Sequence, residues 1–367
     1  MKLNKKRAAI IAVNAAAAAG AVIFFLSGRA AAQSQSYNYA AERWGDGYAQ
    51  ISCFLPEKSE FSVDSVGTAR MQLLNTLQAV SIAPKDGQKL CPDSYSAPFG
   101  QATVSSDIDG SSEAEITAVG GDFFLMRDFR LIDGAYFSGD DIMQDGAVID
   151  RDLAWSLYGS DDISGMNIKI NGVQFYISGV IDTPSTDTEK KCCGELPRAY
   201  ISYSGASSLM TDGESDSESE EPQRFSAVTC YEFIMPDPVE NYAYGSMKKY
   251  FLTLDESSIV IQNTGRFSPA KRLRAIKKLP DLAVMDSSVV MPYWENASRL
   301  TEYKLSMIYR RAAVCAALPL LTAAWLMFKA FRALRKNKKI IIGAVIDAFG
   351  KFFAKVKGLI KSGKKAS

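Results

Sequence analysis

The residue types that carry most enzyme chemistry are scarce in this chain. It has no histidine, which excludes Ser-His-Asp and Cys-His nucleophilic centres, and it has no GxSxG motif. Gly343–Lys351 departs from a phosphate-binding loop because six residues separate its glycines and no Ser or Thr follows the lysine. The acid pairs Asp140-Asp141 and Asp161-Asp162 lie in turn-forming sequence, where solvation explains them better than acid–base catalysis. We therefore expect a protein that is not an enzyme and needs no cofactor.

Cysteine is the remaining reactive residue type. Cys192 and Cys193 are adjacent, but no second cysteine pair completes a zinc site, so no metal is expected. Disulfides are the preferred interpretation for the middle of the chain. The pairs we favour are Cys53 with Cys91, and either Cys192 or Cys193 with Cys230. The alternative is that several of these thiols are small buried apolar side chains.

Two apolar stretches, Ala8–Leu26 and Ala312–Phe328, divide the chain. Each is close to the roughly 20 residues that cross a bilayer. Basic residues precede the first stretch and follow the second, and Lys and Arg accumulate on the cytoplasmic side. The sequence thus predicts a two-pass protein of the plasma membrane, with both termini in the cytoplasm and residues 29–311 outside.

Charge is distributed in agreement with that topology. The chain from residue 329 to the end has 12 basic residues and a single acidic one, whereas residues 8–328 have 26 basic against 40 acidic residues. An alternative for the first stretch is a cleaved signal peptide, because three alanines at 30–32 resemble a cleavage site. The stretch is, however, longer than the ~7–15 apolar residues of a signal peptide.

Residues 29–311 alternate between strand and helix patterns. The most specific signals are Asn171-Gly172, which predicts a tight hairpin turn, and Ser268-Pro269, which predicts the start of a helix. Strands are expected at 48–55, 101–108, 115–121, 167–170, 173–181, 225–235, 258–262 and 281–291, and helices at 64–80, 150–158, 238–254, 269–279 and 294–311. Strand and helix layers flank a stretch of short strands at about 113–224, so the sequence predicts an α+β domain in which one subdomain interrupts another.

Two segments differ in composition from this pattern. Thr211–Arg224 is densely acidic and lacks the spacing of a calcium loop, so it is predicted to be a solvated loop. Residues 338–361 are amphipathic and basic, which favours a helix on the inner leaflet over one docked on an ATPase. The residues that define its two faces are Ile342, Ile346, Phe349, Phe353 and Val356 on the apolar face, with Lys351 and Lys355 on the basic one.

The run from Ile116 to Val180 resembles the periplasmic core domain of MacB/FtsX-type ABC transporter permeases. The matching features are "DFF" at 122–124, Gly134 followed by Phe137, a strand at 147–150 that leads into Leu153-Ala154, and a final Gly179-Val180. Pro292–Arg299 is similar to the stretch that leads back to the membrane in some of these permeases.

The resemblance implies a porter-like βαβ subdomain interrupted by a smaller β-rich one, between two membrane helices. It also implies that the protein transmits the motion of a separate ATPase to the outer domain. Family members normally have four membrane helices, whereas only one clear span follows residue 311 here. The partners implied are membrane lipid, an ATPase subunit and other permease subunits, and the assembly could include further copies of this chain.

Two functions remain open from the sequence. The first is a non-catalytic permease-like subunit that couples an ATPase to export, to lipid or lipoprotein handling, or to envelope signalling. The second is a membrane-anchored scaffold that recruits an extracellular partner such as a cell-wall enzyme. No nucleic acid is expected as a partner, because the basic stretch Lys271–Lys278 lies in the part of the chain predicted to be outside.

Overall fold

The computed structural model describes residues 5–83, 89–139, 141, 143–211, 224–275 and 289–336. The chain divides into two compact units. The first comprises Met1–Ser27 and Ile308–Ser367, and the second comprises Gly28–Met307. Helix α11 contributes to both units because it continues without interruption from Tyr293 to Lys336.

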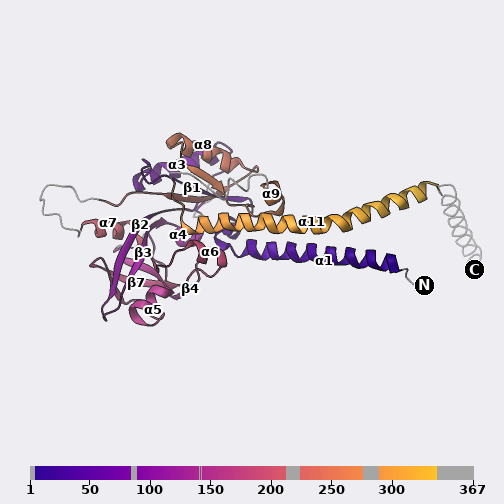
Figure 1. Ribbon diagram of the computed structural model, residues 1–367. Helices are drawn as coiled ribbons and strands as arrows, with labels where there is room; N and C mark the ends of the chain where they lie inside the picture. Colours follow the sequence, from indigo (N-terminus) through magenta and orange to yellow (C-terminus); the bar gives the residue numbers. More distant parts are fainter. Residues whose placement is uncertain are drawn as a thin grey trace, which may run out of the picture. The chain divides into compact units, whose positions relative to one another are not determined.

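The first unit contains both predicted membrane spans as helices, α1 (Lys5–Gln33) and the second half of α11, which lie side by side (Figure 1). Both are long and apolar enough to cross a membrane. The polar residue Asn14 faces the other helix, where its Oδ1 accepts a hydrogen bond of 2.7 Å from the Thr322 hydroxyl. Phe25 contacts Tyr309 with ring centroids 6.1 Å apart. Close contact of this kind, with one interhelical hydrogen bond, is typical of paired membrane helices.

The second unit is built on a single ten-stranded sheet with the order β10-β1-β9-β2-β3-β8-β5-β7-β4, in which β6 pairs with both β2 and β7. The strands are β1 (Tyr48–Phe54), β2 (Asp93–Ser106), β3 (Ser111–Gly121), β4 (Leu131–Gly134), β5 (Gly146–Asp150), β6 (Asn167–Ile170), β7 (Val173–Ile181), β8 (Arg198–Ser202), β9 (Cys230–Pro236) and β10 (Ile259–Gln262). Its helices are η1 (Ser36–Tyr39), α2 (Ala40–Trp44), α3 (Val63–Gln78), α4 (Phe123–Met126), α5 (Arg151–Tyr158), α6 (Asp187–Cys192), α7 (Tyr203–Thr211), α8 (Tyr242–Leu254) and α9 (Pro269–Arg274).

One end of the sheet has the order β10-β1-β9-β2, with α3 joining β1 to β2 and α8 joining β9 to β10. This is the arrangement of a split βαβ fold. Its helices lie close to β1 in Figure 1. The α3 helix begins with a capping box between Ser62 and Ser65. The remaining strands come between β2 and β9 in the sequence, so the mixed α+β architecture with one part interrupting the other is confirmed.

The interrupting part closes on itself. Pairing runs from β2 through β3, β8, β5 and β7 to β6, and β6 pairs with β2 again. The predicted hairpin between β6 and β7 is present, with positive φ at both Asn171 and Gly172, as a type I′ turn requires. Asp150 begins α5 by accepting a hydrogen bond from the Leu153 N–H, and Gly159 ends it in the left-handed conformation.

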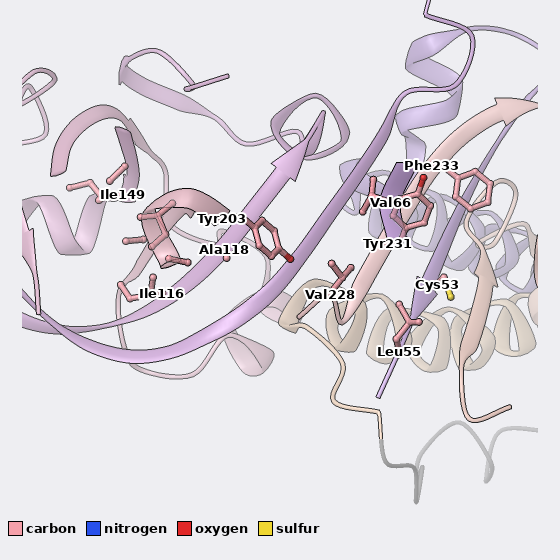
Figure 2. Packing of buried hydrophobic residues seen from close by; sticks show 14 of the residues in the cluster. Cys53, Leu55, Val66, Ile116, Ala118, Ile149, Tyr203, Val228, Tyr231 and Phe233 are labelled. Carbon is pink, nitrogen blue, oxygen red and sulfur yellow. The ribbon is translucent and has the colours of Figure 1, made fainter. Parts of the chain in front are cut away.

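Side chains alternate between two faces of the sheet, as strand geometry dictates. Cys53, Tyr231 and Ala118 belong to the main core cluster, which is shown in part in Figure 2. Their chain neighbours Phe54, Cys230 and Val119 point to the opposite face and pack with Trp294 of α11. The start of α11 therefore covers the second face of the sheet.

The structure differs from the sequence-based expectations at several boundaries. β2 begins at Asp93, well before the predicted strand, and it accommodates Pro98 at an irregularity in its pairing with β3 between Pro98 and Gly100. α8 begins at Tyr242 rather than at Pro238, because the Asp237 carboxylate accepts hydrogen bonds from the N–H groups of Asn241 and Ala243. The predicted strand at 281–291 falls mostly outside the described residues.

Candidate functional site at the root of α11

The first part of α11, Tyr293–Ser306, lies within the second unit and is called here the α11 root. It carries charged and hydroxyl side chains that are buried against the sheet domain, among them Glu295, Ser298, Thr301 and Glu302. Buried polar side chains are costly unless they are paired. Their number on one helix segment makes the root the candidate functional site.

An ion cluster fixes one side of the α11 root. Both side-chain oxygens of Glu295 accept from the Arg266 guanidinium, at 2.7 and 2.8 Å, and Arg299 Nε donates to Glu295 Oε1 at 2.8 Å. Glu302 Oε1 lies 3.1 Å from Arg266 Nε and 2.6 Å from Arg272 Nη1. Burial alone would raise the pKa of Glu295, but the neighbouring Arg266 and Arg299 charges lower it below its ordinary value. Glu295 is therefore a buried carboxylate that stays charged.

A hydroxyl and amide network extends from the ion cluster to the segment that precedes β1. The Tyr37 hydroxyl donates to the main-chain carbonyl of Trp294. The Ser298 hydroxyl lies 3.0 Å from the Tyr37 hydroxyl and 2.9 Å from Asn38 Oδ1. Asn38 Nδ2 donates in turn to Asn263 Oδ1 at 3.1 Å, and Arg266 Nη1 reaches the same oxygen at 3.1 Å. Burial raises the pKa of Tyr37 far above its ordinary value, so its hydroxyl remains a donor.

Aromatic packing secures the other side of the root. The Arg127 guanidinium lies over the Trp294 ring, 4.2 Å from its centroid, and Trp294 meets Phe123 edge to face at 5.9 Å. Tyr293 is covered by the Arg198 guanidinium at 4.7 Å. These contacts come from α4, from Arg127 at its C-terminal end and from β8, which belong to the interrupting part of the domain. One helix thus contacts both parts of the domain.

The two sides of the root are joined through the sheet. Arg127 forms a buried ion pair with Glu232 on β9. The other Glu232 oxygen accepts from the Ser52 hydroxyl on β1 at 2.5 Å, and Asn263 Nδ2 donates to Ser52 at 2.7 Å. The path from Trp294 through Arg127, Glu232, Ser52 and Asn263 returns to the ion cluster at Arg266. Because every link is buried, the arrangement is suited to holding α11 rigidly against the sheet rather than to catalysis.

All six cysteines lie among the described residues, and all six are free thiols. The expected Cys53–Cys91 disulfide is absent because β9 separates the two residues. Asp93 on β2 is level with Phe233 on β9, which is level with Ile51 on β1. β1 and β2 are parallel, and Cys91 lies two residues before this common level whereas Cys53 lies two residues after it. The two cysteines are therefore two strands and four residues apart. This corresponds to about 10 Å across the sheet and about 14 Å along it, beyond the ~7 Å limit for a disulfide.

The expected bond from Cys192 or Cys193 to Cys230 is also absent. Cys230 is level with Ser96 and, one strand farther, with Val119. Gly194, which follows the cysteine pair at the end of α6, lies against the Glu115 carboxylate. Glu115 is four residues along β3 from Val119, so the cysteine pair is displaced along the sheet from Cys230. The three thiols nevertheless line one cavity of about 450 Å³ beside Trp294. Burial raises the pKa of Cys230 to about 12, so its thiol is unreactive near neutral pH.

Other predicted site residues are placed less informatively. Asp161 lies 3.4 Å from Arg151 in a partly exposed ion pair, as expected of a solvated turn. The amphipathic segment with Ile342, Ile346, Phe349, Lys351, Phe353, Lys355 and Val356 lies outside the described residues, as does nearly all of the acidic segment Thr211–Arg224.

The α11 root was not identified as a site from the sequence. Its charges were available as a signal, because Glu295, Arg299 and Glu302 are spaced so that they share one helix face. On an isolated helix this pattern is more often a solvated face. The burial of these residues depends on their pairing with Arg266, which the turn after β10 brings next to the helix.

Asp150 provides a pH-dependent test of the sheet domain. Burial raises its pKa from 3.8 to about 6, although the N–H groups of Leu153 and Arg198 oppose that shift. The folded state binds a proton on the Asp150 carboxyl more tightly than the unfolded state does. The contribution of this proton to the unfolding free energy is therefore complete below pH 3.8 and is lost as the pH rises through 6. The unfolding free energy of the unsubstituted chain should therefore fall with rising pH, whereas that of Asp150→Asn lacks this dependence. Between about pH 4 and 7 the difference between the two should change by about 2–3 kcal/mol in favour of Asp150→Asn.

Chemical denaturation at a series of pH values measures this difference. Asp64→Asn is the matched control, because Asp64 is an exposed residue in the first turn of another helix, α3. A difference between Asp150→Asn and the unsubstituted chain that stays constant over this pH range would contradict the assignment.

Comparison with known proteins places these features in a family. Residues 15–233 match the MacB-like periplasmic core domain. No curated protein matches the chain.

Three solved structures are similar to part of the chain. The periplasmic region of MacB from Actinobacillus actinomycetemcomitans is 15% identical, with a TM-score of 0.36, and the match covers 59% of this chain and 89% of that one. The extracellular domain of the noncanonic ABC-type transporter YknZ from Gram-positive bacteria is 13% identical, with a TM-score of 0.34, over 58% of this chain and 99% of that one. A domain of a putative permease protein from Porphyromonas gingivalis is 14% identical, with a TM-score of 0.34, over 59% and 89%.

The matched segment covers more than half of the chain, and it begins inside α1 and ends inside β9. Together with the two helices able to cross a membrane, it indicates a membrane protein with an extracytoplasmic domain. The chain belongs to the MacB-like periplasmic core domain family of ABC transporter permeases.

Proposed function

We propose that this chain is a non-catalytic permease-type subunit that transmits movement between membrane helices and the extracytoplasmic domain. ATP is hydrolysed by a separate ATPase subunit, and the work serves export, lipid or lipoprotein handling, or envelope signalling. Both termini lie in the cytoplasm, residues 29–311 lie outside, and the basic segment after residue 336 lies on the inner leaflet. Family membership supports the transport role.

The continuity of α11 is the observation that carries the coupling role. One helix includes both the predicted span at 312–328 and the buried root at 293–306. Closely packed contacts transmit displacements between domains better than flexible linkers do. A helix whose root is held by buried ion pairs would pass a displacement to both parts of the sheet.

Isolation of the full chain from native membranes tests the assembly. After mild crosslinking, we expect an affinity-tagged chain to recover an ABC ATPase and further permease subunits. Recovery of an extracellular hydrolase with no ATPase would instead favour the scaffold and would end the transport proposal.

A matched pair of serine variants tests the coupling. Ser298 and Ser306 are both fully buried on α11. Ser298 bonds to the segment before β1, whereas the one described acceptor of the Ser306 hydroxyl is Glu302 O of its own helix, at 2.8 Å. Ser298→Ala should leave the ATPase bound but change the ATPase rate of the complex severalfold, and Ser306→Ala should not. Equal rates in the two variants would contradict the coupling role.

A further inference from the structure

A second cavity, of about 470 Å³, lies beside the ion cluster and is called here the basic pocket. It is bounded by β10, α8, α9 and the α11 root. Its charged lining residues are Arg266, Lys271, Arg272, Arg299 and Glu302. Among the described strands β10 lies at the edge of the sheet, so one side of its backbone is not paired with any of them. Its four basic side chains make the pocket rich in hydrogen-bond donors.

The described lining of the basic pocket carries more positive than negative charge. Glu302 is the only acid among the described residues that line it, and it is shared by Arg266 and Arg272. Glu295 does not line the pocket, and it accepts hydrogen bonds from Arg266 and Arg299. Glu302 is thus the shared acceptor of two guanidinium groups, and Lys271 adds a further cation at the rim. A buried excess of positive charge is costly unless an anion neutralises it.

Arg272 shows this excess most clearly. It is about nine-tenths buried, and its Nε and Nη1 have no hydrogen-bond partner among the described residues. Its Nη1 lies 2.6 Å from Glu302 Oε1 in an ion pair, so Nε is the donor that remains without an acceptor among the described residues. Burial, together with the neighbouring Arg266 charge, lowers the pKa of Arg272, while Glu302 opposes the shift. Unsatisfied guanidinium donors of this kind favour an anionic acceptor.

We propose that the basic pocket binds a phosphate group, held by the guanidinium of Arg272 and the ammonium of Lys271. A planar guanidinium offers paired donors to phosphate oxygens, and a lysine adds a mobile point charge. The volume is within the range of small-ligand sites. The phosphate is that of a lipid headgroup or of a free phosphate compound. The site does not depend on the transport role proposed above.

Binding to the full chain in zwitterionic detergent tests the site, with inorganic phosphate as the first probe and calorimetry as the readout at constant ionic strength. Nanodiscs of phosphatidylcholine with or without phosphatidylglycerol provide the second probe, and native mass spectrometry counts the retained anionic lipids. Lys271→Gln is the principal variant, because Lys271 is exposed and makes only a long 3.4 Å bond to Thr264 O. Arg272→Lys keeps the charge but removes the paired donors. Lys58→Gln, at an exposed lysine on the α3 side of the domain, is the matched control.

We expect Lys271→Gln to weaken binding about tenfold, as loss of one charge-assisted hydrogen bond implies. Arg272→Lys should also weaken it, and Lys58→Gln should leave it unchanged. An effect seen with inorganic phosphate assigns a soluble phosphate compound, and an effect confined to phosphatidylglycerol assigns a lipid headgroup. No binding of either probe to the unsubstituted chain, or equal losses in Lys271→Gln and Lys58→Gln, would overturn the proposal.

Discussion

Replacing Arg266 with Met should lower the free energy of unfolding by about 3–5 kcal/mol, the cost of removing one partner from a buried ion pair. The substitution leaves Glu295 and Glu302 buried, with side-chain exposures of 2% and 8%, without their shared guanidinium. Arg299 and Arg272 remain near one carboxylate each, but neither replaces the two-bond contact of Arg266 with Glu295. Urea unfolding of the full chain in detergent, followed by tryptophan fluorescence, measures the change.

The matched control for Arg266 is Arg151→Met. Arg151 lies 2.9 Å from Asp182 and 3.4 Å from Asp161, but its side chain is 36% exposed. Surface ion pairs contribute about 0–1 kcal/mol, so this variant should unfold nearly like the unsubstituted chain. A second comparison, Arg266→Met combined with Glu295→Gln, should recover part of the loss because one uncompensated charge is removed. Equal losses in Arg266→Met and Arg151→Met would show that the cluster adds no stability.

Trp294→Ala should cost about 3–5 kcal/mol, as expected for truncation of a large buried aromatic residue. Trp294 is 5% exposed and packs in the cluster on the second face of the sheet, where Arg127 lies over its ring. The truncation leaves a cavity beside the buried Arg127–Glu232 ion pair and removes a cation–π contact of about 1–2 kcal/mol. Equilibrium unfolding followed by far-ultraviolet circular dichroism measures this effect without relying on the fluorescence of the deleted ring.

Trp155→Ala is the matched control, because Trp155 is 54% exposed on α5. It should change the unfolding free energy by less than about 1 kcal/mol. Trp294→Phe separates the two contributions, since it keeps an aromatic ring in the cluster but weakens the interaction with Arg127. A loss in Trp294→Ala no larger than that in Trp155→Ala would mean that the α11 root is not anchored by this residue.

Local signals in the sequence predicted much of the architecture. Asn171-Gly172 predicted the β6–β7 hairpin, the periodicity around Leu73 and Leu77 predicted α3, and the two apolar stretches predicted α1 and the second half of α11. These features depend on residues close together in the chain. The first part of β2, which contains Pro98, was not predicted, because a proline fits in this strand only through the irregular pairing of β2 with β3.

The candidate site could not be predicted in the same way, because its pairings join distant segments. Tyr37 and Ser298 are separated by 261 residues, and Arg127 and Glu232 by 105. A single sequence contains no signal that matches these partners. The cysteine pairs failed for a related reason, since their separation depends on strand order and register, which were unknown.

The polar contacts of the α11 root come from one side of the helix, which limits how the helix can move. Glu295, Ser298 and Glu302 reach their partners from one side of the helix. Successive residues of an α-helix are about 100° apart around its axis, so a turn by one residue would take all three away from their partners together. Rotation of α11 about its axis would therefore break these bonds without forming another set. We therefore expect the α11 root to tilt or shift together with the sheet rather than to rotate against it.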